Sequence, residues 1–369
     1  MKDEKFNIPG HKPRILIAPL DWGLGHATRC IPVIATLIKQ HCTVIVAAED
    51  QIKTLLQKEF PYLQFIELKG YSIKYSRYKL GMPVKLLFQL PKIIYRIYAE
   101  NKWLKNIVKE NNIDTVISDN RMGLYHKKIP CVYITHQLTI KTSSRFTERF
   151  AQKIHYHYIN KFKACWVPDA EGDFNLAGAL SHPALLPKVP VTYLGALSRF
   201  EKKQAEIKYD LCVILSGPEP QRTIFEKIIL ADIEKISGQN FLVRGLPQET
   251  KALELKNNSI EIKNYLGADE LNKVIQQSKI IISRCGYSTI MDLVKLQQKA
   301  ILVPTPGQTE QEYLAGYLQQ KKLFYSVAQQ NFSLPEAIKK ATALDCIAWP
   351  VIKDDYKIIV ANFVASLQH

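Results

Sequence analysis

The feature that most constrains the fold is a short apolar run leading into a glycine-bearing turn, which occurs once in each half of the chain. Residues 14–20 read RILIAPL and residues 210–216 read DLCVILS, and Gly23, Gly25 and Gly217 follow them. Apolar runs of this length are typical of strands buried on both faces of a parallel sheet. Each run opens a series of strand-length segments, residues 43–48, 65–68, 114–118, 131–135 and 164–167 in the first half and 240–244, 259–263, 279–283 and 300–303 in the second. Helix-length segments separate them, so we predict two doubly wound α/β domains.

A charged stretch between the two series marks the domain boundary. Residues 199–208 read RFEKKQAEIK, after which the pattern of strands starts again. We therefore predict an N-terminal domain over residues 13–198 and a C-terminal domain over residues 209–345. Residues 346–369 form a C-terminal segment that looks helical from Trp349 to Leu367.

Composition and charge narrow the class of protein. The seven cysteines are dispersed and form no C-x-x-C pair, which disfavours a disulfide scaffold or a zinc site. The N-terminus has mixed charge, and no apolar stretch approaches the ~18 residues of a membrane span, so we expect a cytoplasmic protein without a transmembrane helix. The net charge of +16 would attract nucleic acid, an anionic membrane or phosphorylated substrates.

The first turn, DWGLGH at residues 21–26, lies between a predicted strand and a predicted helix. Backbone amides at a helix N-terminus favour anionic or electron-rich groups. The turn lacks the third glycine of a dinucleotide fingerprint, which disfavours a Rossmann dehydrogenase. His26 at its mouth is suited to accept a proton near neutral pH, or else it caps the helix or packs under the loop. Both interpretations stay open from position alone.

The second half holds a stronger pattern, SRCGYST at residues 283–289, between a predicted strand and a helix expected to begin near Ile290. Amides and hydroxyls at that helix N-terminus, beside Arg284, suit a diphosphate, although an ordinary N-cap is the alternative. Asp292 would accept hydrogen bonds from ribose hydroxyls or merely complement the helix dipole. Residues 303–313, VPTPGQTEQEY, bring further polar groups to the end of the next strand. Such convergence at one edge of a parallel sheet predicts a ligand site.

Together these motifs resemble those of the GT-B glycosyltransferases, in particular family 28. The most specific element is SRCGYSTIMDLVKLQQKAILVPTPGQTEQEYLA at residues 283–315, which is similar to the family's nucleotide-sugar signature. DWGLGH resembles its acceptor-side loop, and SGPEPQ at residues 216–221 a degraded form of its second glycine-rich loop. The resemblance covers both domains. It implies two Rossmann-like domains facing across a cleft, an inverting transfer without metal or other cofactor, and a C-terminal helix that returns to the first domain.

The resemblance also implies roles for individual residues. The donor-binding set would be Gly217, Arg244, Tyr265, Leu266, Arg284, Gly286, Ser288, Thr289, Asp292, Gln308, Gln311 and Glu312. Within it, Arg284 and its neighbours would surround the diphosphate, and Gln311 and Glu312 would touch the sugar. The acceptor side would be lined by Gly23, Gly25, Asn120 and Arg121. The chain departs from the family at Glu312, which replaces a glutamine, at Asp292, which replaces a glutamate, and in the prolines of the Gly217 loop.

The transfer needs a general base to take the proton of the acceptor hydroxyl. We favour His26, with Asp119 and His136 in reserve because both follow predicted strands. Either of these two is otherwise a structural hydrogen-bonding group. The chain has no Asp-x-Asp pair of the kind that holds a metal in other transferases, which leaves helix dipoles and Arg284 to stabilise the leaving diphosphate.

Residues 74–109 carry nine basic side chains interleaved with apolar and aromatic ones. This pattern is typical of an amphipathic helix that rests on an anionic membrane, or of one packed on the core with a solvated lysine face. No RNA-binding signature interrupts the α/β pattern, so nucleic acid is not a predicted partner.

We thus expect a glycosyltransferase of the cell envelope, peripheral at the inner face of the membrane. Its donor would be a UDP-hexose or UDP-N-acetylhexosamine, and its acceptor a hydroxyl of a sugar or a lipid-linked sugar. The alternatives are a nucleotide-sugar 2-epimerase, which needs no acceptor, and a non-catalytic module that binds a sugar nucleotide or lipid.

Overall fold

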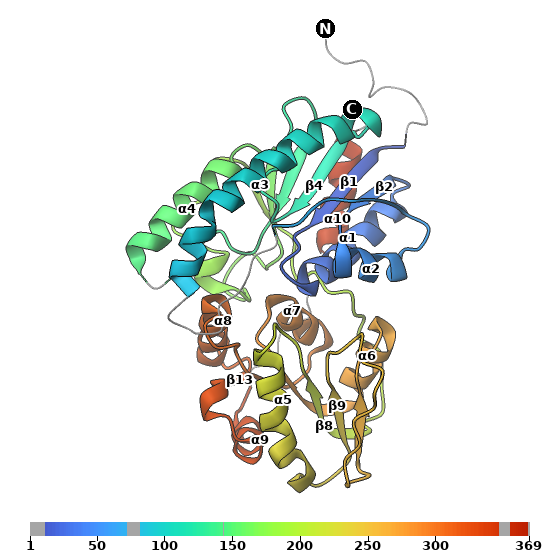
Figure 1. Ribbon diagram of the computed structural model, residues 1–369, viewed down its shortest axis with the longest axis vertical. Helices are drawn as coiled ribbons and strands as arrows, with labels where there is room; N and C mark the ends of the chain where they lie inside the picture. Colours follow the sequence, from blue (N-terminus) through green and yellow to red (C-terminus); the bar gives the residue numbers. More distant parts are fainter. Residues whose placement is uncertain (1–11, 72–81, 143, 347–354, 368–369) are drawn as a thin grey trace. The chain divides into compact units, whose positions relative to one another are not determined.

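The computed structural model describes residues 12–71, 82–142, 144–346 and 355–367, with residues 82–90 described by their backbone alone. The described chain divides into two compact units. The first runs to Leu197 and includes the last helix, and the second begins at Ser198. Each unit is a parallel sheet with helices packed on it, which confirms the expected pair of doubly wound α/β domains (Figure 1).

The sheet of the first unit has seven strands in the order β3-β2-β1-β4-β5-β6-β7, and every neighbouring pair is parallel. Its strands are β1 (Arg14–Pro19), β2 (Thr43–Ala47), β3 (Gln64–Ile66), β4 (Thr115–Asp119), β5 (Cys131–Ile134), β6 (Ala164–Val167) and β7 (Val191–Tyr193). All of β1 beyond Arg14 is buried because helices cover both faces of a parallel sheet.

The helices of the first unit are α1 (Leu24–Lys39), α2 (Asp50–Glu59), α3 (Met82–Glu110), α4 (Arg145–Ile159), the short η3 (Gly178–Leu180) and α10 (Asp355–Ser366). The C-terminal helix α10, red in Figure 1, packs against α1 from the start of the chain. The ring of Phe363 on α10 also contacts Trp166 on β6, with 5.2 Å between the ring centroids. The end of the chain therefore belongs to the first unit.

The sheet of the second unit has six strands in the order β10-β9-β8-β11-β12-β13, again all parallel. Its strands are β8 (Tyr209–Ile214), β9 (Asn240–Val243), β10 (Ile260–Lys263), β11 (Ser278–Ser283), β12 (Ala300–Leu302) and β13 (Tyr325–Ser326). Its helices are α5 (Gln221–Asp232), η4 (Ile233–Lys235), α6 (Ala268–Gln276), α7 (Tyr287–Leu296), α8 (Thr309–Gln320), η5 (Gln329–Asn331) and α9 (Leu334–Ala343).

The structure differs from the sequence-based prediction at several elements. The short edge strands β7 and β13 were not predicted, because their half-buried residues form no apolar run. Strand β3 covers residues 64–66 instead of 65–68. Helix α7 begins at Tyr287 instead of near Ile290, which places Ser288 and Thr289 in its first turn. Residues 349–354 of the expected C-terminal helix and 74–81 of the expected basic segment lie outside the described residues.

Each sheet has one switch point, at which the strand order reverses. On one side of the first strand of the unit lie the next two strands of the chain, and on its other side lie the strands that follow them. In the first unit it lies between β1 and β4, and in the second between β8 and β11. Loops leaving the carboxyl ends of these strands diverge to opposite faces and leave a crevice, which is where open α/β sheets bind their ligands. The predicted site residues follow β1, β4 and β5 in the first unit and β8 to β12 in the second, and so they gather at the carboxyl edge of each sheet.

Candidate active site

In the first unit the fold brings the three base candidates together. His26 is the third residue of α1, Asp119 is the last residue of β4, and His136 follows β5 by two residues. The imidazole Nδ1 of His26 lies 3.2 Å from Oδ2 of Asp119. Because β1, β4 and β5 are adjacent, residues that are far apart in the sequence meet at one edge of the sheet.

The centre of this cluster is Arg29, a residue that the sequence analysis did not single out. Its Nε donates to Oδ2 of Asp119 at 2.9 Å, and its Nη2 donates to the other carboxylate oxygen. The same guanidinium reaches Nδ1 of His136 at 3.0 Å and Nδ1 of His26 at 2.8 Å. Arg29 stands one helical turn after His26, and that i, i+3 spacing is the signal that would have found it.

Burial and charge set the protonation of the cluster. Burial, and then the charge of Arg29, lower the pKa of His26. Burial alone would raise the pKa of Asp119, but Arg29 and His26 more than offset it and hold that pKa at about 2. At neutral pH the cluster therefore contains a neutral His26 beside an ionised Asp119.

Access separates the three candidates. The side chain of Asp119 is fully buried and His136 is 4% exposed, whereas 16% of the His26 side chain is exposed. Both contacts of the His26 ring are made through Nδ1. Its Nε2 is thus the atom of this cluster best placed to meet a hydroxyl group from outside.

The backbone around the cluster is held in uncommon conformations. Gly23, immediately before α1, has φ 130°, and Asn120, immediately after β4, has φ 56°. Glycine adopts such angles freely and asparagine tolerates them better than most residues, so these two turns depend on their residue types. Gly25 lies inside α1 rather than in the turn before it. Whether these residues line an acceptor site stays a prediction.

Arg121, expected on the acceptor side, is buried inside the first unit and bonded to other residues of that unit. Its side chain is 1% exposed, and its Nε donates to Glu100 on α3 at 2.8 Å. The same guanidinium donates to the carbonyl oxygens of Pro19 at the end of β1 and of Lys69 after β3. The side chain therefore holds the loops of three strands together and is not free to contact a ligand.

In the second unit, α5 and α7 begin beside the switch point. Their N-cap residues, Pro220 and Gly286, supply no side-chain hydrogen bond, but Glu219 accepts one from the amide of Thr223 in the first turn of α5 at 3.3 Å. Gly286, Ser288 and Thr289 at the start of α7 are half-buried, so a ligand can reach them. The N-terminus of α7 is a favourable place for an anion.

Buried polar atoms without a partner lie at the same edge. Ser283 Oγ, at the end of β11, and Thr305 Oγ1, after β12, are buried and make no hydrogen bond in the described structure. Buried hydroxyls normally have a partner, because an unpaired one costs about 1–3 kcal/mol. Both hydroxyls therefore have unused hydrogen-bonding capacity at this edge of the sheet.

Arg284, expected at the diphosphate, points into the unit. It is 2% exposed, its Nη2 donates to the carbonyl oxygen of Gln221 at 2.8 Å, and its guanidinium lies 4.5 Å from the ring centroid of Phe225. Burial lowers its pKa to about 10, which still leaves it charged at neutral pH. Arg284 joins the starts of α5 and α7 through Gln221, and only its Nε is without a partner.

Asp292, expected at the ribose, lies in the second turn of α7. Its Oδ1 accepts a hydrogen bond from Ser198 at 2.6 Å. Burial raises the pKa of Asp292 to about 6, because the bond from Ser198 and the charge of Arg199 offset that effect only in part. A ribose would have to share this carboxylate with Ser198.

The side chains at the start of α8 are engaged with their own loop. Gln311 Oε1 accepts from the amide of Thr305 at 2.9 Å, Glu312 Oε1 accepts from that of Gly307 at 3.1 Å, and Gln308 bonds Gln311. Beside them lies an open cavity of about 610 Å³, whose lining includes Pro304, Glu312, Ala315, Gly316, Gln319 and Val327. Glu312 is thus the predicted sugar contact that borders a cavity.

The residues expected near the base and the second glycine loop lie after β8, β9 and β10. Gly217 has φ 102°, and a Cβ atom at this position would meet Thr305 in an ordinary van der Waals contact. Arg244 Nε donates to Glu226 at 2.6 Å, and Glu226 in turn pairs with Arg222 on α5, so Arg244 is already partnered. After β10, Tyr265 is 38% exposed and Leu266 is buried.

Two features bear on metals and membranes. Within the described ranges, no three His, Cys, Asp or Glu side chains are placed to share a metal ion. Among the helices of the described part of the chain, none combines the length and hydrophobicity needed to cross a bilayer.

Comparison with known proteins agrees with this geometry. Residues 229–346 match the glycosyltransferase family 28 C-terminal domain. The chain is 20% identical over 308 residues to the UDP-N-acetylglucosamine–N-acetylmuramyl-(pentapeptide) pyrophosphoryl-undecaprenol N-acetylglucosamine transferase of Haemophilus influenzae (strain PittEE), covering 80% of this chain and 79% of that protein.

Solved structures agree in fold. The glycosyltransferase of kitacinnamycin superposes with a TM-score of 0.62 at 13% identity, covering 97% of this chain and 94% of that one. MurG of Acinetobacter baumannii gives a TM-score of 0.53 at 12% identity, covering 96% and 95%. The chain is therefore a glycosyltransferase with the GT-B fold that is similar to family 28, whose C-terminal domain matches residues 229–346.

Proposed function

We propose that the protein transfers a sugar from a UDP-hexose or UDP-N-acetylhexosamine to a hydroxyl group of a lipid-linked acceptor, with inversion and without a metal ion. The observation that carries the proposal is the contact between His26 and Asp119 at the switch point of the first unit. The similarity to the Haemophilus influenzae transferase, whose name specifies a UDP-linked donor and an undecaprenol-linked acceptor, supports the choice of substrates.

In this reaction Nε2 of His26 takes the proton of the acceptor hydroxyl while the oxygen attacks the anomeric carbon. The bond from that carbon to the diphosphate breaks, and the nucleoside diphosphate leaves with the bonding electrons. Asp119 stabilises the imidazolium that forms, since its carboxylate lies beside Nδ1. Such a base contributes about 10²–10⁴-fold to the rate.

The leaving diphosphate would be held by groups of the second unit. The N-terminus of α7, whose N-cap supplies no side-chain hydrogen bond, and the buried hydroxyls of Ser283 and Thr305, which make no hydrogen bond in the described structure, lie at one edge of the sheet. Arg284 would fix the two helix starts relative to each other through Gln221 and would add its charge from behind. Donors and dipoles held in advance of the reaction are the usual means of stabilising developing charge.

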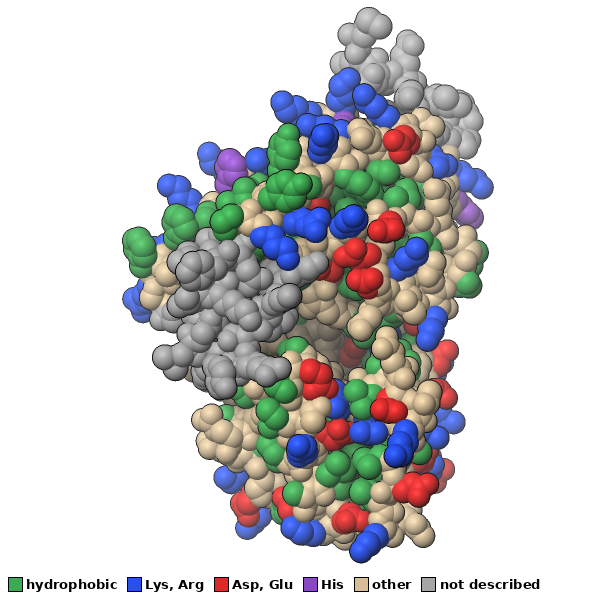
Figure 2. All heavy atoms as spheres, viewed as in Figure 1, with side chains coloured by type: hydrophobic (Ala, Val, Ile, Leu, Met, Phe, Trp, Pro, Cys, Tyr) green, Lys and Arg blue, Asp and Glu red, His purple; other side chains and the backbone are tan. Residues whose placement is uncertain are grey.

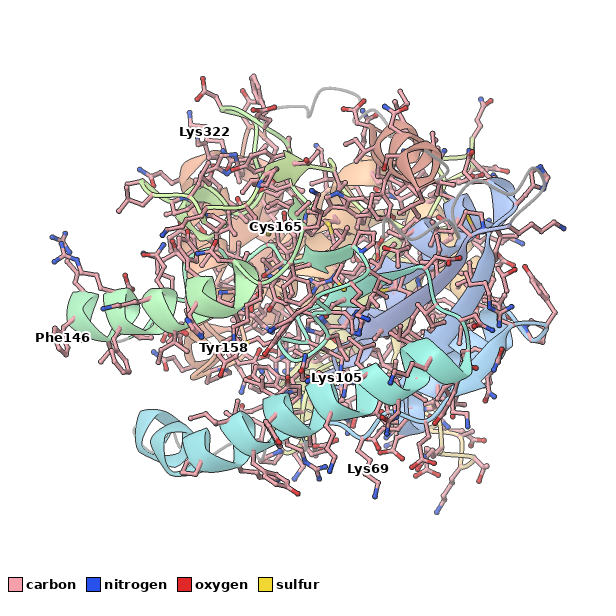
Figure 3. All side chains as sticks on the ribbon, turned by 90° about the horizontal axis from the view of Figure 1, so that it is seen from above. Lys69, Lys105, Phe146, Tyr158, Cys165 and Lys322 are labelled. Atoms are coloured by element: carbon pink, nitrogen blue, oxygen red, sulfur yellow. The ribbon has the colours of Figure 1, made fainter. Side chains whose placement is uncertain are left out.

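A surface patch on α3 and α4 supports a lipid-linked acceptor. Ile94, Tyr95 and Tyr98 on α3 and Phe146, Phe150 and Ile154 on α4 are exposed, Phe146 by 81%. Exposed Lys92, Lys102 and Lys105 accompany the first group, and exposed Arg145, Arg149 and Lys153 the second. Figure 2 shows green and blue side chains intermixed over these helices. In Figure 3 the two helices lie side by side, with Phe146 at the outer end of α4.

This patch suits the interface of an anionic bilayer. Basic side chains near such a surface contribute about 1 kcal/mol each, and burying an aromatic side chain adds about 1.5–3 kcal/mol. The protein should float with vesicles that contain anionic lipid and less with neutral ones. Phe146→Ser with Phe150→Ser should weaken flotation, while Tyr62→Ser, an exposed aromatic residue outside the patch, should not. Equal flotation of all three proteins would refute the membrane role.

The transfer itself is tested by incubating the protein with labelled UDP-N-acetylglucosamine or UDP-glucose and a polyprenyl-diphosphate-linked sugar. We expect labelled lipid whose new glycosidic bond is β, since the donors are α-linked. His26→Gln should reduce turnover by about 10²-fold or more while leaving the affinity for the donor unchanged. Conversion of donor alone into its epimer would favour an epimerase instead, and binding without turnover across acceptors would favour a binding module.

A further inference from the structure

The cluster at the first switch point contains a buried carboxylate that requires a compensating charge. Asp119 has no exposed surface and is ionised. An isolated carboxylate in such a place would take up a proton or draw one onto a neighbour. The groups of this unit that face it and His26 are Arg29 and Cys30 on α1, Tyr133 on β5, whose phenol pKa burial raises so that it stays neutral, and His136 after β5. Burial raises the pKa of the Cys30 thiol, so it stays neutral.

His26 is therefore one of two cations that Asp119 could recruit, and Arg29 is the other. Arg29 donates to both carboxylate oxygens, while Nδ1 of His26 lies 3.2 Å from one of them. A permanently charged guanidinium that makes two bonds satisfies the carboxylate without help from the imidazole. A histidine that had to supply this charge would be protonated before the reaction and useless as a base.

The contact between Arg29 and His26 acts in the same direction. Nη2 of Arg29 lies 2.8 Å from Nδ1 of His26, where it can only donate, so it opposes a proton on that nitrogen. Nδ1 either accepts from Arg29 or donates to Asp119, and it cannot do both. In the first arrangement the proton of the neutral ring is on Nε2, and the ring cannot act as the base. In the second arrangement Nε2 carries the free lone pair, and the base mechanism requires this tautomer.

We propose that Arg29 is a positioning residue that neutralises Asp119 and so keeps His26 uncharged until the acceptor hydroxyl delivers its proton. The proposal rests on the proposed function only in naming that hydroxyl. The protonation state of His26 is a property of the unliganded protein and is measurable without substrate.

The test is a pH titration of the histidine rings by ¹H–¹⁵N NMR, which reports the charge and the tautomer of each imidazole. His26→Gln and His136→Gln variants assign the signals. In the native protein we expect His26 to stay neutral to below its ordinary midpoint of about 6.5. In Arg29→Gln the midpoint of His26 should rise by about one pH unit or more, because the carboxylate then recruits the imidazole.

Lys39→Gln is the matched control, since it removes one positive charge from the exposed end of the same helix and should leave the titration unchanged. If Arg29→Gln does not fold, the double variant Arg29→Gln with Asp119→Asn removes guanidinium and carboxylate charge together, and burial should then keep the midpoint of His26 below 6.5. An unchanged midpoint and tautomer in Arg29→Gln, or a midpoint above 6.5 in the double variant, which has no carboxylate left to charge the ring, would overturn the proposal.

An activity readout separates this role from a purely structural one. The acid limb of the pH profile of kcat/KM should move upward in Arg29→Gln by the same interval as the NMR midpoint, with activity recovering at high pH. A loss of activity equal at every pH would contradict the proposal. If the titration shifts as expected but no acceptor is glycosylated, the proposed function fails and the role of Arg29 in protonation stands.

Discussion

The buried pair of Arg121 and Glu100 offers a sharp test of how the first unit is held together. Replacing Arg121 by methionine keeps much of the side-chain volume but leaves the Glu100 carboxylate, which is 3% exposed, without its cation. The variant also loses the bonds to Pro19 and Lys69. Removing one partner of a buried ion pair costs about 3–5 kcal/mol, so we expect the free energy of unfolding of this unit to fall by that amount.

The loss of unfolding free energy in Arg121→Met should depend on pH. Burial raises the pKa of Glu100 even in the native protein, since its bonds to Arg121, Tyr71 and Gly123 offset that effect only in part. The folded carboxyl thus binds its proton more tightly than the unfolded one, and stability is lost as pH rises. Without Arg121 this effect grows, so the variant should be weaker at pH 8 than at pH 5.

Urea unfolding followed by tryptophan fluorescence provides the assay, because three of the four tryptophans, Trp22, Trp103 and Trp166, belong to the first unit. The double variant Arg121→Met with Glu100→Gln should recover at least about 1 kcal/mol relative to the sum of the single changes. Arg145→Met, at an exposed position of α4, is the control and should stay within about 0.5 kcal/mol of the native protein. A loss below 1 kcal/mol for Arg121→Met, or strictly additive effects, would refute the assigned coupling.

Three further changes have defined outcomes. Burial lowers the pKa of His155 to about 4, so the stability that its neutral form contributes is complete above pH ~6.5 and falls as the pH is lowered toward 4. Between pH 7.5 and 4.5 the free energy of unfolding of His155→Leu, measured in urea, should therefore fall by about 2–3 kcal/mol less than that of the native protein. Gly70→Ala should destabilise by about 1–3 kcal/mol, because the new Cβ would overlap the carboxylates of Asp21 and Glu49, whereas Gly316→Ala on α8 meets open space and should be neutral or stabilising. Asp292→Asn should weaken binding of UDP by about tenfold in calorimetry if the carboxylate holds the ribose, and unchanged affinity would remove it from that role.

The order of secondary structure was accessible from the sequence because it depends on local patterns. The run of residues 14–20, buried from Ile15 onward, shows that a strand is covered on both faces whatever lies beside it. The short strands β7 and β13 were missed, since they owe their conformation to pairing with β6 and β12 rather than to their own residues.

The candidate site was accessible in its location but not in its contacts. His26, Asp119 and His136 were predicted because each follows a strand, and the carboxyl ends of adjacent parallel strands meet at one edge. Position in a turn did not reveal where a long side chain points. Arg121 and Arg284 both turn inward to carbonyl oxygens, whose positions depend on the packing of other strands.

By itself, then, the sequence determined the two α/β domains, the family likeness and the edges at which ligands would gather, because hydrophobic periodicity and turn chemistry act over a few residues. Only the tertiary structure decided that Arg29 stands between both histidines and Asp119, and that Ser198 occupies the carboxylate of Asp292. These pairings join residues up to about a hundred positions apart, and their energy comes from excluding water around charges that no local pattern brings together.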